Sequence, residues 1–179
     1  RLGFVSRPAS FRKENVTMRN LTQKSSKQFF GAAIRVVTLT LFLMVFGAST
    51  ALAQSRAYVT NQTDNTVSVI DTATNTVVGP PILVGTNPIA IAVTPNGAFA
   101  YVANQGSNNV SVISAALNSV VATVPVGDGP SGIAITPNGA FAYVTNLLGE
   151  RVSVINTADD TVAVTIPVTG FPRAVAISP

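Results

Sequence analysis

The chain has 179 residues, of which 47% are hydrophobic and only 10% are charged, with a formal net charge of +4 and a sequence pI near 10.0. Eight of the eleven basic residues precede Gln54, so the positive charge belongs to the N-terminal part. From Gln54 onward three arginines stand against six carboxylates, which makes this part mildly acidic. A nucleic-acid partner requires a basic patch on the folded domain, and we therefore expect none.

Histidine and cysteine are both absent from the sequence. Without cysteine, an exported chain cannot rely on disulfides and needs a hydrophobic core. Without histidine, Ser-His-Asp and Cys-His catalysis and His- or Cys-ligated zinc or copper sites are excluded within this chain. Glycine-rich phosphate-binding loops are missing as well. The sequence therefore predicts no catalytic residues, no metal site and no cofactor.

The N-terminal 53 residues have the pattern of a leader. Residues 1–17 show no apolar periodicity and are interpreted as unstructured or as read-through upstream of an initiator at Met18. Residues 18–53 combine a basic start, an apolar run at 36–48 and an Ala-Leu-Ala end, which is typical of a signal peptide cleaved after Ala53. The alternative is a retained membrane anchor, although the run falls short of the roughly 20 apolar residues that span a bilayer. We expect an exported product that is periplasmic, extracellular or on the cell surface.

Residues 54–179 repeat one pattern three times. The stretch AYVTNQTDNTVSVIDTATNTVV begins at Ala57, and variants of it begin at Ala100 and Ala142. A period of this length, built of short apolar runs and turn residues, is typical of a repeat fold. Each period predicts four antiparallel strands, which in the middle period cover 89–93, 98–102, 110–113 and 120–126, with a polar loop at 104–109.

The residue types order these strands from inside to outside. The first strand, with equivalents at 133–135 and 175–177, is rich in small alanines, which suit the crowded region near a central axis. The turn Pro95-Asn96-Gly97 suits a tight hairpin to the second strand. Pro125 and the Pro80-Pro81 pair place the fourth strand at an edge, where the extra residue of the first period is tolerated as a bulge.

Four antiparallel strands per period, ordered inner to outer, describe a β-propeller blade. The WD40 class is disfavoured because tryptophan and histidine are absent. A parallel β-helix would need shorter rungs, and an immunoglobulin-like sandwich would not repeat internally. The predicted fold class is therefore all-β, a β-propeller built of four-stranded antiparallel blades.

The sequences YVTN at 58–61 and 143–146, and YVAN at 101–104, resemble the YVTN β-propeller repeat family. The accompanying VSVI and TPNG segments fit as well, so the resemblance covers residues 57–179. It implies a secreted or cell-surface propeller, commonly of about seven blades, similar to surface-layer and periplasmic binding proteins. The motif belongs to the scaffold, so no active-site residue is implied.

The number of periods conflicts with a closed propeller. Residues 54–179 hold about three periods, whereas propellers close with about four to eight blades. The repeat region also begins on a second strand and stops on a first strand. We interpret it as a fragment of a propeller of about seven blades. The alternative is self-association into a ring of six blades, in which each terminal first strand completes the broken blade of its neighbour.

A candidate binding surface follows from the strand order. The loops after the YVTN strands and those that join outer to inner strands lie on one face, and they differ most among the periods. A face that varies on a repeating scaffold is the default ligand surface. Its candidate residues are Asp128, Arg151, Phe171 and Arg173, of which the last two, at the mouth of the third inner strand, could meet an anionic or aromatic ligand. The alternative is that they are solvated loop residues.

Two pairs of oxygen-bearing residues, Asp64-Asn65 and Asp159-Asp160, lack the spacing of a calcium loop and are predicted to be turns.

Three functions remain open. The first is a secreted, non-catalytic propeller scaffold that binds a macromolecule or a cell-surface component through this loop face. The second is the N-terminal part of a propeller enzyme, lactonase-like or a quinone-dependent dehydrogenase, whose catalytic residues lie in missing blades. The third is a structural surface-layer component. The expected partners are a protein or cell-surface ligand or a second copy, with membrane contact only through an uncleaved leader.

Overall fold

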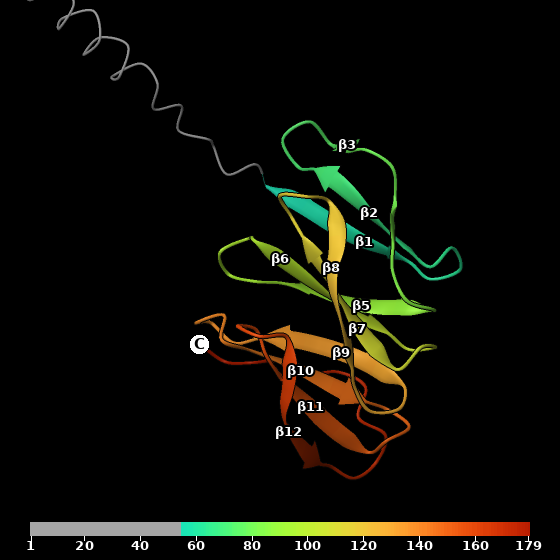
Figure 1. Cartoon of the computed structure of the whole chain (residues 1–179), viewed down its shortest axis with the longest axis vertical. Helices are drawn as coiled ribbons and strands as arrows, with labels where there is room; N and C mark the ends of the chain where they lie inside the picture. Colours follow the sequence, from blue (N-terminus) through green and yellow to red (C-terminus); the bar gives the residue numbers. More distant parts are fainter. Residues whose placement is uncertain (1–54) are drawn as a thin grey trace, which may run out of the picture. The chain divides into compact units, whose positions relative to one another are not determined.

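The computed structural model describes residues 55–179, and the predictions for 1–17 and 18–53 lie outside the described residues. The described part consists of three antiparallel sheets of four strands each, which follow one another along the chain (Figure 1). We call these sheets the first, second and third blade. Residues 55–179 contain no helix long and apolar enough to cross a membrane.

The second and third blades repeat one strand order, and the first has no inner strand among the described residues. The first blade comprises β1 (Arg56–Asn61), β2 (Thr66–Asp71), β3 (Thr76–Val77) and β4 (Ile82–Leu83). The second comprises β5 (Pro88–Val93), β6 (Phe99–Asn104), β7 (Asn109–Ser114) and β8 (Ser119–Pro125). The third comprises β9 (Pro130–Ile135), β10 (Phe141–Asn146), β11 (Arg151–Asn156) and β12 (Thr161–Pro167). In the second and third blades each strand pairs with its sequence neighbour, which confirms the predicted blade of four antiparallel strands.

The first hairpin of each complete blade is formed by the predicted proline turn. The Phe99 amide donates to Thr94 Oγ1 at 3.0 Å, and the Ala98 amide donates to Asn96 Oδ1 at 3.0 Å. Gly97 has a φ of 70°, a conformation that glycine adopts without steric cost. The third blade repeats the turn at 136–139.

The outermost strand is irregular in all three blades, although the sequence predicted an irregularity only in the first. In the second blade the register of β7 with β8 shifts between Val112 and Ile113, which leaves a bulge in β8. In the first blade the outer strand is divided into β3 and β4, and both segments pair with β2. The interruption between them contains Pro80 and Pro81. Proline cannot donate to a ladder, so the strand is broken where it has no outer neighbour.

The asparagine of each YVTN-type segment binds the serine of the VSVI segment in the same blade. The Nδ2 atoms of Asn61, Asn104 and Asn146 donate to the Oγ atoms of Ser68, Ser111 and Ser153 at 2.9, 2.9 and 3.0 Å. The prediction that 104–109 is a polar loop is therefore too wide. Asn104 ends β6 and is fully buried, and Asn109 starts β7, because Asn104 Nδ2 donates to Asn109 Oδ1 across the hairpin at 2.8 Å.

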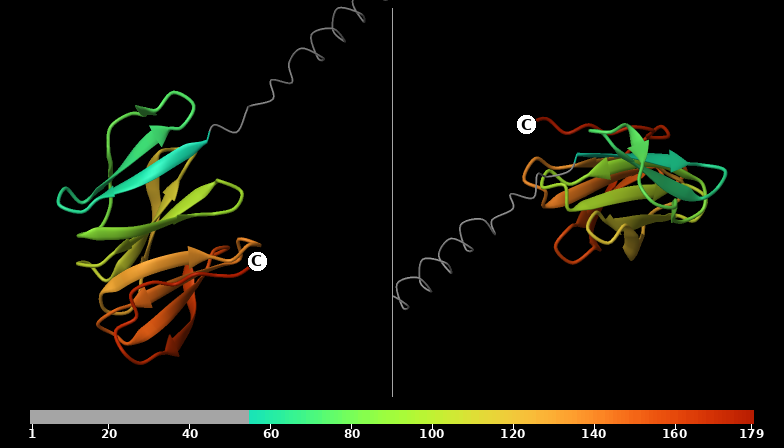
Figure 2. Two further views of the ribbon diagram at one scale, coloured as in Figure 1. Left: turned by 180° about the vertical axis from the view of Figure 1, so that it is seen from behind. Right: turned by 90° about the horizontal axis from the view of Figure 1, so that it is seen from above.

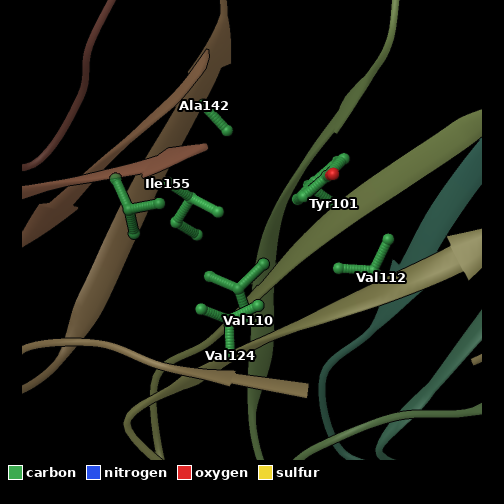
Figure 3. Close-up of a cluster of buried hydrophobic side chains, with 7 residues drawn as sticks. Tyr101, Val110, Val112, Val124, Ala142 and Ile155 are labelled. Atoms are coloured by element: carbon green, nitrogen blue, oxygen red, sulfur yellow. The ribbon is translucent and has the colours of Figure 1, made fainter. Parts of the chain in front are cut away.

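The core lies between the blades. Figure 2 shows the three blades side by side from two further directions. Between the first and second blades the buried residues are Val67, Val69, Ile82, Ala100, Val102 and Ile113. Between the second and third blades they are Tyr101, Val110, Val112, Val124, Ala142, Val144 and Ile155 (Figure 3). Because neighbouring sheets bury these faces, the blades stabilise one another rather than folding around separate cores.

Polar bonds link the blades at the ends of these cores. The Tyr101 hydroxyl of the second blade donates to Asp160 Oδ1 of the third at 2.7 Å. Burial, and then the hydrogen bond and negative charge of Asp160, raise the pKa of Tyr101 above its ordinary value. At the preceding interface Arg56 donates to Ala115 O and Asn118 Oδ1 at 2.7 and 2.8 Å.

The two ends of the repeat region are incomplete, as the strand count predicted. The first blade has no strand on the inner side of β1 among the described residues. The prediction of an inner strand at 175–177 is wrong, because residues 171–179 do not pair with any strand in the described part of the chain. This tail is held beside β9, where Pro172 O accepts from Ser131 Oγ at 2.9 Å and Arg173 O accepts from Thr145 Oγ1 at 3.3 Å. The described residues offer it no second strand with which to pair.

Asn104→Ala should lower the free energy of unfolding by about 2–3 kcal/mol, because it leaves buried polar partners unsatisfied. Asn61→Ala removes the same motif residue from the first blade, where it is half-buried, and should cost about 1 kcal/mol. Urea unfolding of the full chain measures both. If both variants lost the same free energy of unfolding, burial of the asparagine would not account for its contribution to stability.

Tyr101→Phe should weaken the fold at neutral pH by about 1.5–3 kcal/mol, because it removes a hydrogen bond to a charged group. The folded chain holds the Tyr101 proton more tightly than the unfolded chain, so the stability due to this group is complete below about pH 10 and falls as pH rises above it. The free energy of unfolding of Tyr101→Phe should therefore decrease less than that of the wild-type chain as the pH rises above this value. Unfolding between pH 7 and 11 tests this, with Tyr143→Phe as the control for hydroxyl removal. An unchanged alkaline slope in Tyr101→Phe would refute the assignment.

Candidate functional site

The predicted loop face consists of two sets of segments. Turns follow β1, β6 and β10 at 62–65, 105–108 and 147–150, and connections lead from one outer strand toward the next inner strand at 84–87, 126–129 and 168–171. The first two connections bond to the turns on both sides, and the third bonds to the turn before it. For the second connection, the Val126 amide donates to Asn108 O at 3.0 Å and the Leu147 amide donates to Gly129 O at 2.8 Å. The two sets therefore lie together, as the strand order predicted.

Asparagine side chains hold the first two connections. Asn65 Oδ1 accepts from the Asn87 amide at 2.8 Å, and Asn108 Oδ1 accepts from the Gly129 amide at 2.9 Å. Both asparagines have positive φ, which this residue type adopts more readily than most. Glu150 occupies the equivalent place in the third blade, where its backbone oxygen accepts from the Val168 amide at 3.0 Å. The third blade thus keeps the backbone bond that Asn65 O and Asn108 O also accept, but it carries a glutamate in place of the asparagine whose side chain holds the connection.

Phe171 adopts an unusual backbone conformation. Its φ is 52°, and the equivalent residues of the earlier connections, Asn87 and Gly129, have φ of 59° and 64°. Asparagine and glycine enter this region at low cost, whereas a bulky aromatic residue there is an outlier. The side chain is 60% exposed, so core packing does not account for the choice of phenylalanine. Strain of this kind is found at functional positions and motivates a functional hypothesis.

The structure brings two of the four predicted site residues together. Asp128 and Arg151 flank Gly149, because Asp128 O accepts from the Gly149 amide at 3.1 Å and Arg151 Nε donates to Gly149 O at 2.8 Å. Asp128 Oδ1 also accepts from Asn108 Nδ2 at 3.4 Å. Both side chains are exposed at one turn of the third blade.

The other two predicted residues, Phe171 and Arg173, lie in the tail beside β9. Arg173 is exposed, and its backbone oxygen accepts from Thr145 Oγ1. The sequence placed this pair at the mouth of a third inner strand, but residues 171–179 form no strand. The two residues therefore stand on a segment fixed by Ser131 and Thr145 rather than by a sheet.

Leu148 is a site candidate that the sequence analysis did not select. It lies at the tip of the turn 147–150 and is 66% exposed, whereas the first two blades carry Thr63 and Gly106 at this place. Its side chain lies against Gly129, where an added Cβ would come within 2.9 Å of Leu148 Cγ. The sequence did contain an indication of this candidate, because an apolar residue stands in this loop where the other two repeats have a polar or small one.

Two equivalent grooves open between the outer parts of the blades. The first, of about 270 Å³, is lined by Leu83, Val84, Gly85, Asn109, Ser111, Val120 and Thr123. The second, of about 240 Å³, is lined by Pro125, Val126, Gly127, Arg151, Ser153, Val162 and Thr165. Each residue of the second groove follows its counterpart in the first by one repeat. Arg151 replaces Asn109, so only the second groove carries a charged lining residue.

The face opposite the loop face carries repeated turn chemistry. A pocket of about 220 Å³ lies there between the turns at 94–97 and 136–139. Its polar groups are already used within the fold, since Thr94 Oγ1 donates to Asn96 Oδ1 at 2.7 Å and Thr157 Oγ1 donates to Gly139 O at 2.6 Å. This face is similar in both complete blades, so we place the candidate site on the loop face.

Asp64 and Asp159 of the described part lie in turns. Residues 55–179 contain no group of three or more His, Cys, Asp or Glu side chains that could hold a metal ion. Asp159 Oδ1 accepts from the amide and hydroxyl of Thr161 at 3.2 and 2.8 Å, as expected for a turn. The Asp64-Asn65 pair lies in the first of the loop-face turns, where Asn65 binds the next connection.

Comparison with solved structures shows the propeller fold. Hydrazine synthase from Kuenenia stuttgartiensis is 37% identical with a TM-score of 0.67, over 70% of this chain and 36% of that chain. A candidate 6-phosphogluconolactonase from Bacteroides uniformis is 20% identical with a TM-score of 0.60, over 69% and 41%. AztD from Citrobacter koseri is 21% identical with a TM-score of 0.52, over 62% and 31%.

The chain thus spans about a third of the length of these structures. No protein-family model and no curated protein matches the sequence. Together with the three four-stranded antiparallel sheets, the likeness establishes that residues 55–179 form blades of an all-β propeller.

Phe171→Gly should raise the free energy of unfolding by about 1 kcal/mol relative to Phe171→Ala, because both variants remove the ring but only glycine relieves the positive φ. Urea unfolding of the two variants measures this difference. If alanine is as stable as glycine at this position, Phe171 is not strained in solution.

Proposed function

We propose that the chain is an exported, non-catalytic β-propeller scaffold that binds a macromolecule or a cell-surface component through the loop face of its third blade. The signal-peptide pattern of residues 18–53 supports export. The absence of His and Cys supports a binding role rather than catalysis in these blades. The inner strands β5 and β9 also support a binding role, because their residues are Pro, Ile, Ala, Val and Gly apart from a single serine. That serine, Ser131, already donates to Pro172 O.

The observation that carries the proposal is the departure of the third blade from a repeating scaffold. Leu148 and Phe171 expose large apolar surfaces on this blade, and Asp128, Glu150 and Arg151 surround the same turn. Exposed apolar or aromatic residues with an arginine at the rim are typical of interface hot spots. The equivalent turns of the first two blades carry polar or small residues. A protein or cell-surface ligand would therefore bind at the third blade.

Membership of the YVTN β-propeller repeat family is part of the same proposal. It is supported by the repeated structural use of the motif residues, since each motif asparagine bonds its VSVI serine and Tyr101 links two blades. We also propose that the folded part binds no nucleic acid, because its carboxylates outnumber its arginines. Membrane contact would come only from an uncleaved leader.

A matched pair of leucines tests the binding surface. Leu148 and Leu117 are 66% and 70% exposed, but Leu117 lies in the hairpin turn after β7, at the opposite end of the strands. The labelled full chain is incubated with the isolated cell envelope of its host, and bound protein is measured by sedimentation. Leu148→Ser should weaken binding by about tenfold or more, as expected for losing a buried apolar contact, and Leu117→Ser should leave it unchanged.

Two outcomes would contradict the proposal. The wild-type chain could fail to sediment with the envelope, or the two leucine variants could bind equally well. Because both substitutions replace an exposed leucine with serine, a general loss of solubility would affect them alike.

The second candidate is part of a propeller enzyme, and the solved structures favour it in one respect. Hydrazine synthase and the candidate lactonase carry enzyme names, and their chains are far longer than the part matched here. Catalytic residues would then lie in further blades. Sequencing the gene beyond Pro179 discriminates: His, Glu or Asp on further inner strands would favour a lactonase-like or dehydrogenase activity, whereas many more plain repeats would favour a surface-layer component.

A further inference from the structure

We propose that the second groove, between the outer parts of the second and third blades, binds the carboxylate side chain of an acidic protein segment through Arg151. This role deepens the proposed function and rests on it, because it names the chemistry of the partner that the third blade would bind. The residues that line the groove come from the two blades that have all four strands.

Arg151 occupies a position that serves the scaffold in the other two blades. There the residue at this position accepts a hydrogen bond from the motif asparagine, at 3.0 Å to Thr66 Oγ1 and at 2.8 Å to Asn109 Oδ1. An arginine side chain has no acceptor atom. Apart from its bond to Ser153, Asn146 Nδ2 is therefore left with backbone oxygens at 3.3 and 3.4 Å. The third blade gives up a scaffold bond, so stability does not account for the arginine.

The Arg151 side chain lies at the loop-face end of the groove. Its Nε donates to Gly149 O at 2.8 Å, and a Cβ added at Gly127 would come within 3.1 Å of Arg151 Cδ. The turn and the preceding connection thus hold the aliphatic stem. In the part of the chain that the structure describes, neither Asp128 nor Glu150 forms an ion pair with this guanidinium. Its terminal nitrogens therefore remain available for a bidentate contact with a carboxylate.

Two hydroxyl groups line the same groove. Ser153 follows Arg151 by two residues along β11, and Thr165 on β12 is the Cα partner of Ser153, so the three side chains share one face of the sheet. Ser153 is 2% exposed, and its Oγ accepts from Asn146 Nδ2 at 3.0 Å. Within residues 55–179 its hydroxyl hydrogen has no acceptor. The groove therefore offers donors to a group that only accepts, such as a carboxylate.

The size and the remaining lining of the groove favour a side chain over a free small molecule. Pro125, Val126 and Val162 make the rest of the lining largely aliphatic, which suits the methylene groups of a glutamate. The volume of about 240 Å³ lies below the roughly 300–1,000 Å³ of pockets that enclose a whole small ligand. A partner lying across the loop face would therefore insert one side chain here.

The first groove shows what the scaffold alone requires. It has a similar volume of about 270 Å³, and Ser111 and Thr123 stand at the positions of the two hydroxyl residues of the second groove. Asn109 stands at the position of Arg151, so the arginine is the one polar difference between the two linings. The first groove is therefore a matched control within the same molecule.

A labelled peptide tests the assignment. A short fluorescein-labelled peptide of alternating alanine and glutamate is titrated with the full chain at low ionic strength, and binding is measured by fluorescence anisotropy. The control peptide has glutamine in place of every glutamate. The wild-type chain should bind the glutamate peptide about fivefold or more tightly than the control, because only a carboxylate forms charge-assisted bonds with the guanidinium. Added salt should reduce this difference.

Substitution of Arg151 separates binding from stability. Arg151→Asn restores the residue of the second blade and should weaken binding of the glutamate peptide to the level of the control peptide. It should not lower the free energy of unfolding in urea, because Asn146 regains an acceptor. Arg151→Lys keeps the charge without the planar fork and should bind with intermediate affinity. A merely structural role would instead make Arg151→Asn less stable.

Two threonine variants place the same charge in the two grooves. Thr165→Glu and Thr123→Glu change equivalent residues, both of which are exposed. The carboxylate introduced in the second groove should occupy Arg151 and weaken peptide binding by about fivefold or more. Thr123→Glu should weaken it by less than about twofold, because it adds only a distant, screened charge.

Several results would overturn the assignment. These are no binding of the glutamate peptide at about 1 mM, equal binding of both peptides, undiminished binding by Arg151→Asn, and equal effects of the two threonine variants. Stronger competition by inorganic sulfate or by polygalacturonate than by unlabelled glutamate peptide would show a different anion. The peptide assay contains no cell envelope, so its failure would leave the result of the Leu148→Ser comparison standing.

Discussion

The structure depends on one constraint: a four-stranded blade has two faces and cannot bury both by itself. Val112 and Tyr101 of the second blade are buried only because Ala142 and Ile155 of the third blade cover them. Stability in such an arrangement is a sum of nearest-neighbour interfaces, so the central blade is covered on both sides and each end blade on one. The exposure of Val77 and Ile166 at the ends follows directly from this arrangement.

The polar interactions keep the blades uniform and thereby allow the loops to differ. The bond between Asn104 and Ser111 joins the second and third strands of one blade at the end where the loop face begins. Backbone bonds then join each turn of the loop face to the connection that follows it. Side chains that take no part in these bonds can change without disturbing the sheets. The third blade uses this freedom at Leu148, Glu150 and Phe171, and it accepts a strained backbone at Phe171.

Local patterns in the sequence were sufficient for the strand order, the proline-broken outer strand and the offset of the repeats, because these depend on turn chemistry and periodicity. Features set by distant partners were not predictable. Asn104 looked like a loop residue, although Ser111 and Asn109 hold it in a buried strand. Tyr101 gave no indication of its bond to Asp160, which lies 59 residues away. The tail has the sequence of a strand, but a strand requires a pairing neighbour, which the described part of the chain lacks.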